Sequence, residues 1–346
     1  MSGAAPAAFG GAPPVPGLSD DQRRRIRLAA RCPEVPALPR VPGAGEVFAE
    51  DGVRCQRMHN GVRVVEDGYC GRWMTELIRE LRGYHEPQEE AVFHQLLPRV
   101  RQGGTMVELG GYWGYYSLWF QRVVADARTY LVEPDPGHLR VGRQNFALNG
   151  AEGRFTEAAV GRVSGPPAPF PCDSDGLVRQ VPRVSLDDFL AREGIESVDV
   201  LLADIQGFEL EMLEGASGAL DRGAIRFLVL STHHHSISGD PLTHQKCLQL
   251  LQGRGARIIA AHGVAESYTG DGLIVAALRP EDASLPTVEV SHNRASESLF
   301  REVEYDLADA WAQIAELRRV AQWPPVRLAR AVLRRARGLS YQRSRP

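Results

Sequence analysis

Lysine is almost absent from this chain of 346 residues: Lys246 is the only one, and nearly every basic side chain is an arginine. The formal net charge of −3 provides no basic excess, so nonspecific binding of nucleic acid by the whole chain is not expected. The five cysteines are scattered and never spaced as Cys-x-x-Cys, which predicts free thiols in a reducing compartment.

Membrane and export signals are also missing. No apolar run approaches the ~18 residues that span a membrane, and the opening Met-Ser-Gly-Ala-Ala-Pro lacks the basic and apolar parts of a signal peptide. We therefore expect a soluble cytoplasmic protein. The dinucleotide pattern Gly-x-Gly-x-x-Gly is absent as well, which argues against a nicotinamide-dependent dehydrogenase.

The chain does contain a strand–turn–helix sequence at residues 104–117, Gly-Thr-Met-Val-Glu-Leu-Gly-Gly-Tyr-Trp-Gly-Tyr-Tyr-Ser. Gly110, Gly111 and Gly114 let the backbone approach a ligand closely, and the helix start that follows offers unpaired N–H groups. Glu108 stands just before these glycines, where its carboxylate would repel a pyrophosphate. This arrangement favours a cationic, amino-bearing ligand.

A second apolar strand, predicted at 128–133, ends in Glu133, a position from which an acid binds both hydroxyls of a ribose. With these two acid-tipped strands the chain resembles the S-adenosylmethionine-dependent methyltransferases. The resemblance implies that Glu108 and the glycine turn hold the methionine half of the cofactor and that Glu133 holds its ribose. It also implies that a third strand and turn, at 155–161, faces the adenine.

Two later segments narrow the resemblance. Residues 183–190, Arg-Val-Ser-Leu-Asp-Asp-Phe-Leu, and 198–215, Val-Asp-Val-Leu-Leu-Ala-Asp-Ile-Gln-Gly-Phe-Glu-Leu-Glu-Met-Leu-Glu-Gly, are similar to the FkbM family of methyltransferases. That family shows Leu-Asp-Asp-Leu, then Lys-Ile-Asp-Val-Glu-Gly-x-Glu, then Leu-x-Gly. The matching positions are Asp204, Gly207, Glu209, Leu213 and Gly215.

The similarity extends roughly from Tyr84 to Leu278 and departs from the family pattern at two places. Ala203 stands where the family usually has a Lys, and Gln206 where it usually has a Glu. Members of the family mostly methylate hydroxyl groups of sugars or natural products. The resemblance thus implies an O-methyltransferase that acts on a sugar, a glycan or a glycosylated natural product.

Strands and helices alternate from Gly104 to Leu278, which predicts a mostly parallel sheet with helices on both faces. Seven strands are the number that the resemblance implies, in an α/β, Rossmann-like class I methyltransferase fold. Ligands of such sheets lie beyond the carboxyl ends of the strands, where the motifs above fall. The predicted strands are 105–109, 128–133, 154–159, 198–204, 225–231, 256–261 and 271–278.

Composition divides the rest of the chain. The N-terminal segment is rich in Ala, Pro and Gly and is predicted to be mostly disordered, apart from a helix capped at Ser19. A small β element is expected around the hairpin signal Asn60-Gly61. The predicted units are a disordered N-terminus (1–45), an N-terminal cap element (46–95), the methyltransferase domain (96–280), and a C-terminal helix with an arginine-rich tail (281–346).

The C-terminal segment leaves two pairs of alternatives open. Apolar residues recur every seven positions from Phe300 to Ala321, which predicts a helix that either pairs two chains into a homodimer or packs on the sheet domain. Residues 327–345 carry arginines, no acid and an apolar face. They predict either peripheral contact with an anionic inner membrane surface or a solvated tail.

The pocket is expected to be closed by the segment before residue 95 and by loops near Cys172 and Tyr268. Residues 83–94 resemble the part of the family that lies over the cofactor. Tyr84, His85 or Glu86 either lines the pocket or belongs to an ordinary helix start.

Catalysis requires alignment of the two reactants, together with a base or a metal that activates the hydroxyl. Asp204 ends the fourth strand, and His233, His234 and His235 follow the fifth. If that strand continues, His233 and His235 share a face, and an imidazole with a pKa of roughly 6.5 is a natural general base. Asp204 either orients this base, binds a divalent metal such as Mg²⁺ or Zn²⁺, or only accepts local backbone hydrogen bonds.

We therefore predict a methyltransferase with a histidine base near Asp204, with no nucleic acid as partner. The alternative is an inactive methyltransferase-like scaffold in a glycan pathway, which the departures at Ala203 and Gln206 favour. A metal-free base is preferred over a metal. The predicted cofactor-binding residues are Glu108, Gly110, Gly111, Tyr112, Gly114, Ser117, Glu133, Pro134, Ala159 and Asp204.

Overall fold

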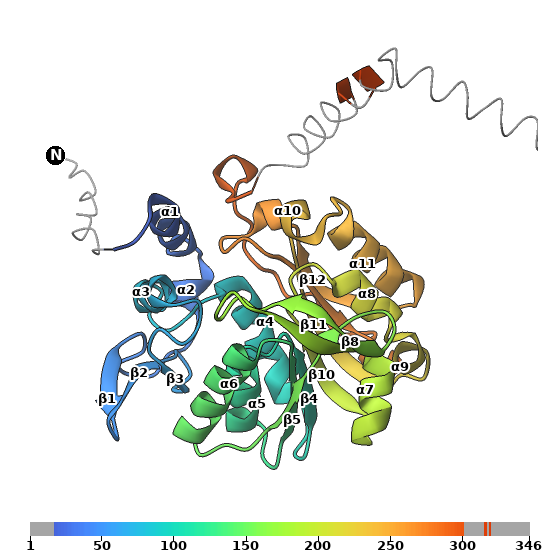
Figure 1. The fold of residues 1–346 in the computed structure, drawn as a ribbon, viewed down its shortest axis with the longest axis horizontal. Coiled ribbons are helices and arrows are strands. Elements are labelled where there is room, and N and C mark those ends of the chain that lie inside the picture. Colours follow the sequence, from blue (N-terminus) through green and yellow to red (C-terminus); the bar gives the residue numbers. More distant parts are fainter. Residues whose placement is uncertain (1–16, 301–314, 317, 320–346) are drawn as a thin grey trace, which may run out of the picture.

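A seven-stranded sheet forms the centre of the computed structural model, which describes residues 17–300, 315–316 and 318–319 (Figure 1). The strand order is β12-β13-β11-β10-β4-β5-β6. All neighbours run parallel except β13, which is antiparallel to both β11 and β12. The predicted mostly parallel sheet is confirmed. Its strands are β4 (Thr105–Leu109), β5 (Arg128–Glu133), β6 (Arg154–Glu157), β10 (Val198–Ala203), β11 (Ile225–Thr232), β12 (Arg257–His262) and β13 (Gly272–Ala277).

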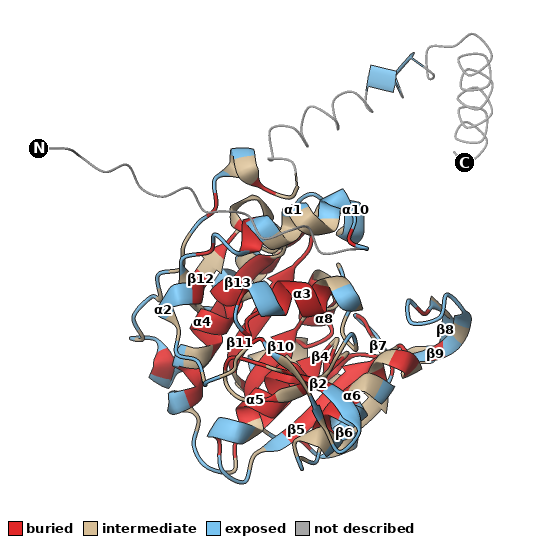
Figure 2. Ribbon diagram, turned by 90° about the vertical axis from the view of Figure 1, so that its left-hand side faces the viewer, coloured by how far each residue is buried: buried red, intermediate tan, exposed pale blue. Residues whose placement is uncertain are grey.

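Side chains alternate along the central strands, so that each strand contributes to two hydrophobic cores. On β10, Val200 and Leu202 lie in one core, and Leu201 and Ala203 lie in the other. Figure 2 shows these strands as a buried layer between helices. The helices of the first core include α4 (Pro87–Leu96), α5 (Tyr115–Val123) and α6 (Pro136–Leu148), and those of the second include α7 (Leu186–Glu193), α8 (Glu209–Glu214), α9 (Ser217–Asp221) and α11 (Thr243–Gly253).

The N-terminal extension packs beside this sheet and contains the predicted small β element. Helix α1 begins at the predicted cap, where Ser19 and Gln22 form a capping box. Two helices thus lie within the segment whose composition predicts mostly disorder, and residues 1–16 are outside the described residues. The elements are α1 (Asp20–Ala29), α2 (Glu34–Ala37), β1 (Val47–Glu50), β2 (Val53–Arg57), β3 (Arg63–Val65) and α3 (Arg72–Glu80).

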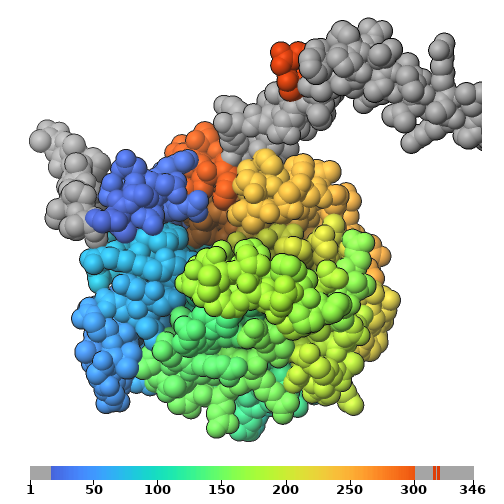
Figure 3. All heavy atoms as spheres, viewed as in Figure 1, coloured from blue at the N-terminus to red at the C-terminus, as the bar shows by residue number. Residues whose placement is uncertain are grey.

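Hydrogen bonds join this extension to the sheet domain at both ends. The Asn145 side chain on α6 accepts from the backbone N–H of Val65 at 2.8 Å. Arg24 on α1 donates to the carbonyl of Ser298 at 2.7 Å, and Figure 3 shows the blue N-terminal helix lying against the orange segment that contains Ser298. The extension is therefore placed to form part of a binding pocket.

A three-stranded sheet, not predicted from the sequence, projects from the domain between β6 and α7 (Figure 2). Its longer strand pair is an antiparallel hairpin with many exposed residues. The first strand of the hairpin has the sequence Gly-Pro-Pro-Ala-Pro-Phe-Pro, which does not predict a strand, since proline usually marks a loop and is tolerated only at a sheet edge. The strands are β7 (Ala159–Val160), β8 (Gly165–Pro171) and β9 (Val178–Val184).

The C-terminal heptad segment and the arginine-rich tail fall almost wholly outside the described residues. The homodimer and the membrane contact therefore remain predictions, as do the cytoplasmic location and the boundaries of the four units. Within the described parts of the chain, no helix has the length and apolar character needed to cross a membrane.

Candidate active site

The glycine turn lies between β4 and α5, as the sequence predicts. Gly110 has a φ of +76° and Gly114, the N-cap of α5, a φ of +68°, which favour glycine. Glu108 is buried, and its carboxylate accepts the backbone N–H of Ser117 at 3.0 Å. Burial raises the pKa of Glu108 to about 7, although the backbone hydrogen bond from Ser117 opposes this shift.

Glu133 at the end of β5 is held by three donors. It accepts the backbone N–H groups of Tyr112 and Asp135 at 3.3 and 2.9 Å, and His138 Nδ1 lies 3.3 Å from it. The ring of Tyr112 stacks on His138 with centroids 3.5 Å apart, and its hydroxyl accepts from the backbone N–H of Cys70. The glycine turn and the predicted ribose acid are therefore joined, and a ribose at Glu133 would meet the Tyr112–His138 pair.

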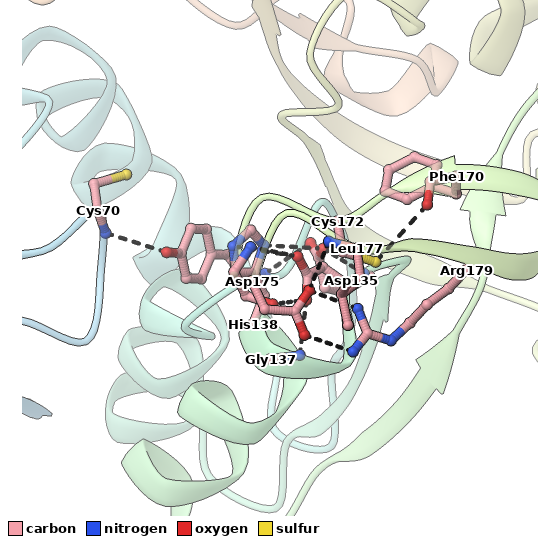
Figure 4. Close-up of polar contacts among 12 residues, drawn as sticks. Cys70, Asp135, Gly137, His138, Phe170, Cys172, Asp175, Leu177 and Arg179 are labelled. Atoms are coloured by element: carbon pink, nitrogen blue, oxygen red, sulfur yellow. Dashed lines mark hydrogen bonds and ion pairs between the residues drawn. The ribbon is translucent and has the colours of Figure 1, made fainter.

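The tip of the β8–β9 hairpin docks beside this strand end, on Asp135 (Figure 4). Asp135 caps α6 through Gly137 and accepts both the backbone N–H and the hydroxyl of Ser174, at 2.9 and 2.6 Å. Within the tip, Arg179 donates to Asp175 and lowers the pKa of that carboxyl to about 2. The loop near Cys172 thus belongs to a hairpin that docks on Asp135, and closure of the pocket by this loop remains a prediction.

The remaining predicted cofactor residues lie around the same edge of the sheet. Pro134 follows β5 directly, and Ala159 begins β7, where it pairs with Arg183. Ser117, in the first turn of α5, is fully buried, and its hydroxyl has no hydrogen-bond partner among the described residues. A buried hydroxyl without a partner is uncommon and marks a place where a ligand would supply one.

Four polar side chains surround His233 at the carboxyl ends of β10 and β11. Its Nδ1 lies 2.8 Å from Glu209, and its Nε2 lies 3.2 Å from Asp204 and 3.6 Å from Asp271. The amide nitrogen of Gln206 is within hydrogen-bonding distance of both Asp204 and the same Nε2. We call Asp204, Gln206, Glu209, His233 and Asp271 the acid–histidine cluster.

Charges within this cluster shift its pKa values in opposite directions. Burial disfavours a charge on His233, but Asp271, Asp204 and Glu209 outweigh it and raise the pKa of the imidazole well above its usual value. Burial raises the pKa of Asp271 to about 7, although His233 lowers it. The pKa of His233 therefore lies above the ordinary value that the sequence argument assumed, and the histidine base itself remains a prediction.

The other two histidines do not extend the strand. β11 ends at Thr232, and His235–Ser238 forms the short helix α10, of which His234 is the N-cap. The ring of His234 stacks on Phe300 with centroids 4.5 Å apart. His233 and His235 therefore do not share a strand face, and the structure brings only His233 of the three into the acid–histidine cluster.

The two departures from the family pattern have simple structural settings. Gln206 has a φ of +51° in the turn after β10, and its amide takes part in the acid–histidine cluster. Counted back from Asp204, the Lys of the pattern falls on Leu202 rather than Ala203. Both side chains are buried, one in each core, so neither position exposes a catalytic group.

Residues before α4 lie against the glycine turn. His85 is buried, with its two ring nitrogens 3.3 Å from Glu86 and 3.3 Å from Glu90, and its ring contacts the edges of Trp113 and Tyr115. Burial opposes the charge on His85, but Glu86 and Glu90 raise its pKa to about 10. The alternative in which this segment lines the pocket fits the structure, because His85 and Glu86 line the cavity described next.

A cavity of about 190 Å³ opens beside the acid–histidine cluster. Its polar lining includes Glu86, His233 and Asp271, and its aromatic lining includes Tyr69 and Trp73. Asp271 lies in the loop between β12 and β13, near the expected closing loop at Tyr268, and no pattern in the sequence marks it as a site residue. The remaining lining residues are Arg25, Cys70, Met74, Leu77, His85, Gln206, Ile237, Thr269, Gly270 and Phe300.

The metal alternative gains no candidate ligands here. Over the described ranges of the chain, no three or more His, Cys, Asp or Glu side chains are arranged to hold a metal ion. Metal dependence therefore remains a prediction.

The sheet order, the glycine turn and the acids after its strands define a class I methyltransferase fold. Residues 102–258, a little under half of the chain, match the family model of the methyltransferase FkbM domain. The predicted resemblance is confirmed, and the cofactor that the family implies is S-adenosylmethionine. The glycine turn, Glu133 and the unpartnered Ser117 hydroxyl fit this cofactor.

Several solved structures are similar in fold. One is a precorrin-6y C5,15-methyltransferase from Geobacter metallireducens GS-15, with 17% identity, a TM-score of 0.37, and coverage of 56% of this chain and 89% of that chain. Another is a putative O-methyltransferase from Klebsiella pneumoniae, with 15% identity, a TM-score of 0.36, and coverage of 77% and 92%. A third is TrmK from M. capricolum in complex with S-adenosyl-homocysteine, with 10% identity, a TM-score of 0.35, and coverage of 72% and 96%. The comparison with curated proteins gave no match.

Proposed function

We propose that the protein is an S-adenosylmethionine-dependent O-methyltransferase whose acceptor hydroxyl binds in the cavity beside the acid–histidine cluster. The observation that carries this proposal is the position of Asp271, a carboxyl with a pKa of about 7 that lines the cavity 3.6 Å from His233. The cofactor supplies an electrophilic methyl group. The chain has to orient the acceptor, exclude water and receive the hydroxyl proton.

Asp271 is the proposed proton acceptor, and His233 positions and stabilises it. A general base works best when its pKa lies near the operating pH, and about 7 meets that condition. The imidazolium of His233 attracts the Asp271 carboxylate and prevents its pKa from rising further. Asp204, whose pKa His233 lowers against the effect of burial, stays ionised and keeps His233 charged.

The acceptor class follows from the shape and lining of the cavity together with the family resemblance. A volume of about 190 Å³ is that of a single sugar-sized ring rather than an extended chain. Aromatic rings from Tyr69, Trp73 and Phe300 offer apolar faces for the C–H face of such a ring, while Glu86 and Thr269 offer acceptors or donors for its hydroxyls. We therefore propose a sugar hydroxyl, free or within a glycosylated product.

The scaffold alternative receives less support. It depends on the two departures from the family pattern, yet the amide of Gln206 donates to Asp204, and the apolar residues at 202 and 203 lie in the cores. A chain that had lost its chemistry would have no need of a buried, fully surrounded imidazolium at its strand ends.

Two measurements test the proposed function. Calorimetric titration of the full chain with S-adenosylhomocysteine should show binding, and incubation with S-adenosylmethionine and a panel of methyl glycosides should yield an O-methyl product that mass spectrometry and NMR identify. Asp271→Asn should lower turnover by about 100-fold or more while S-adenosylhomocysteine still binds. Absence of binding would refute a cofactor-dependent enzyme, and a methyl group on nitrogen or carbon would refute O-methylation.

A further inference from the structure

Glu89, in the first turn of α4, is a buried carboxyl with one oxygen left unsatisfied. Its side chain is only 6% exposed, and one oxygen accepts the hydroxyl of Ser231 on β11. The other oxygen, Oε1, is buried and has no hydrogen-bond partner among the described residues. A buried carboxyl oxygen without a donor is costly, so this atom marks a place where the folded chain awaits a partner.

The neighbours of Glu89 make the site negative. Glu86 lies at the N-cap of the same helix and accepts the hydroxyl of Tyr116 on α5, and Asp204 follows β10. Burial, reinforced by Glu86 and Asp204, raises the pKa of Glu89 well above its usual value, so the side chain is held neutral. Among described residues Glu89 has no ion pair.

The next residue shows how different this position is. Glu90 is equally buried, but it is paired with His85, which lowers the pKa of Glu90 despite burial. Two adjacent carboxyls of one helix are therefore in opposite protonation states, one with its cation present and the other without. The missing component at Glu89 is a positive charge.

The position of Glu89 relates this missing charge to the cofactor. Asp204, one of the two acids that act on Glu89, has its carbonyl against Gly110 of the glycine turn. Glu86, the other acid, lines the cavity of the acid–histidine cluster. Glu89 thus belongs to the space between the glycine turn and the acceptor cavity, where the methionine half of S-adenosylmethionine would carry its ammonium and its sulfonium.

We propose that Glu89 is a ligand for a positive charge of the methionine half of the cofactor and that it releases its proton when the cofactor binds. The proposal rests on the proposed function only in requiring that the cofactor binds. The O–H bond of the neutral carboxyl breaks, the proton passes to solvent buffer, and the carboxylate pairs with the arriving cation. Glu89 would then favour ligands that carry a positive charge at this position over neutral ligands of the same shape.

Calorimetry tests this proposal without any acceptor. The full chain is titrated with S-adenosylmethionine and with S-adenosylhomocysteine near pH 7, each in phosphate and in Tris, because these buffers take up protons with different enthalpies. The difference between buffers gives the number of protons released. We expect about one proton per cofactor bound, since a neutral carboxyl becomes ionised.

Three variants define the result. Glu89→Gln keeps the shape and neutrality of the free side chain, and it should lose the proton release and bind about 30-fold more weakly, as expected when a charge partner is removed from a buried pair. Glu80→Gln, at the exposed end of α3, is the matched control and should behave as wild type. Ser231→Ala removes the hydroxyl that bonds Glu89 but leaves the carboxyl, so the proton release should persist.

The two ligands identify the charge. Proton release with both assigns Glu89 to the ammonium, and release with S-adenosylmethionine alone assigns it to the sulfonium; either result supports the proposal. Binding with no proton release, or with a release that is unchanged in Glu89→Gln and therefore comes from another carboxyl such as Glu108, would overturn it. If the wild type binds neither ligand, the proposed function falls together with this inference.

Discussion

The carbonyl oxygen of Asp204 lies so close to Gly110 that a Cβ atom at residue 110 would be only 1.7 Å from it. The two residues belong to neighbouring strand ends that are 94 residues apart in the sequence, numbered 110 and 204. The absence of a side chain at Gly110 therefore allows Asp204 of the acid–histidine cluster to approach the glycine turn, because any side chain at 110 would push the two strand ends apart.

Gly110→Ala should accordingly damage both stability and binding. The φ of +76° and the 1.7 Å contact with backbone leave no room for a methyl group, so we expect a loss of about 2 to 4 kcal/mol in the free energy of unfolding. Denaturant unfolding measures this loss, and S-adenosylhomocysteine titration should show much weaker binding. Gly253→Ala, where nothing lies within 4 Å of the added Cβ, should have little effect on either quantity.

The pH profile of methyl transfer should follow Asp271. Its carboxyl becomes an effective base only when ionised, so kcat should rise as the pH increases through about 7 and level off above it. Asp271→Asn should lower kcat by about 100-fold or more and remove this rise. A rise with its midpoint well away from pH 7, or an unchanged profile in Asp271→Asn, would show that another group accepts the proton.

His233→Gln separates positioning from general base catalysis. Loss of the imidazolium removes a charge that lowers the pKa of Asp271, so the midpoint of the kcat profile should move to higher pH and kcat at pH 7 should fall about 10-fold. If His233 were itself the base, His233→Gln would instead abolish the pH dependence of kcat. His234→Gln, at the N-cap of α10, should leave the profile in place.

Stability should depend on pH through Glu108. Its folded pKa of about 7 lies above the usual 4.5, so the folded chain holds a proton that the unfolded chain releases. The contribution is complete below about pH 4.5 and is lost as the pH rises to about 7, on the order of 3 kcal/mol in all. Glu108→Gln should flatten the curve of unfolding free energy against pH over this range, as measured by denaturant titration.

The docked hairpin can be displaced by one methyl group. A Cβ at Gly137 would lie 2.3 Å from Ser174 Oγ, so Gly137→Ala should release the tip of the β8–β9 hairpin from Asp135. We expect faster cleavage by trypsin after Arg179 and a several-fold weaker affinity for S-adenosylhomocysteine, with the sheet domain still folded. Unchanged proteolysis would mean that the tip is held by other contacts.

The sheet was predictable because its strands are buried on both faces and are mostly apolar, such as Val198–Ala203, in which Asp199 is the one polar residue, and each ends in a polar turn. The glycine turn and Glu133 were predictable for the same reason, since both directly follow such runs. The hairpin β8–β9 was not, because its exposed, proline-rich strands carry no apolar alternation.

Side-chain encounters across the sheet were harder to foresee. Asp271 meets His233 only because β13 runs antiparallel beside β11, a pairing that no local pattern in the sequence records. The pKa of His233 could not be inferred either, since it depends on three carboxylates from separate elements. The three consecutive histidines suggested a continuing strand, but the chain turns into α10 after Thr232, and this local change of direction decides which ring faces the acids.

Two parts of the protein line the cavity beside the acid–histidine cluster, and they have different functional constraints. Trp73 and Met74 come from the N-terminal extension, whereas Asp271 and His233 come from the sheet domain. In the proposed function, only the sheet-domain residues belong to the part of the chain that binds the cofactor and accepts the hydroxyl proton. Related enzymes could therefore acquire new acceptors by exchanging or mutating the extension alone, and an engineer who wishes to redirect this protein should diversify the first eighty residues before touching the sheet.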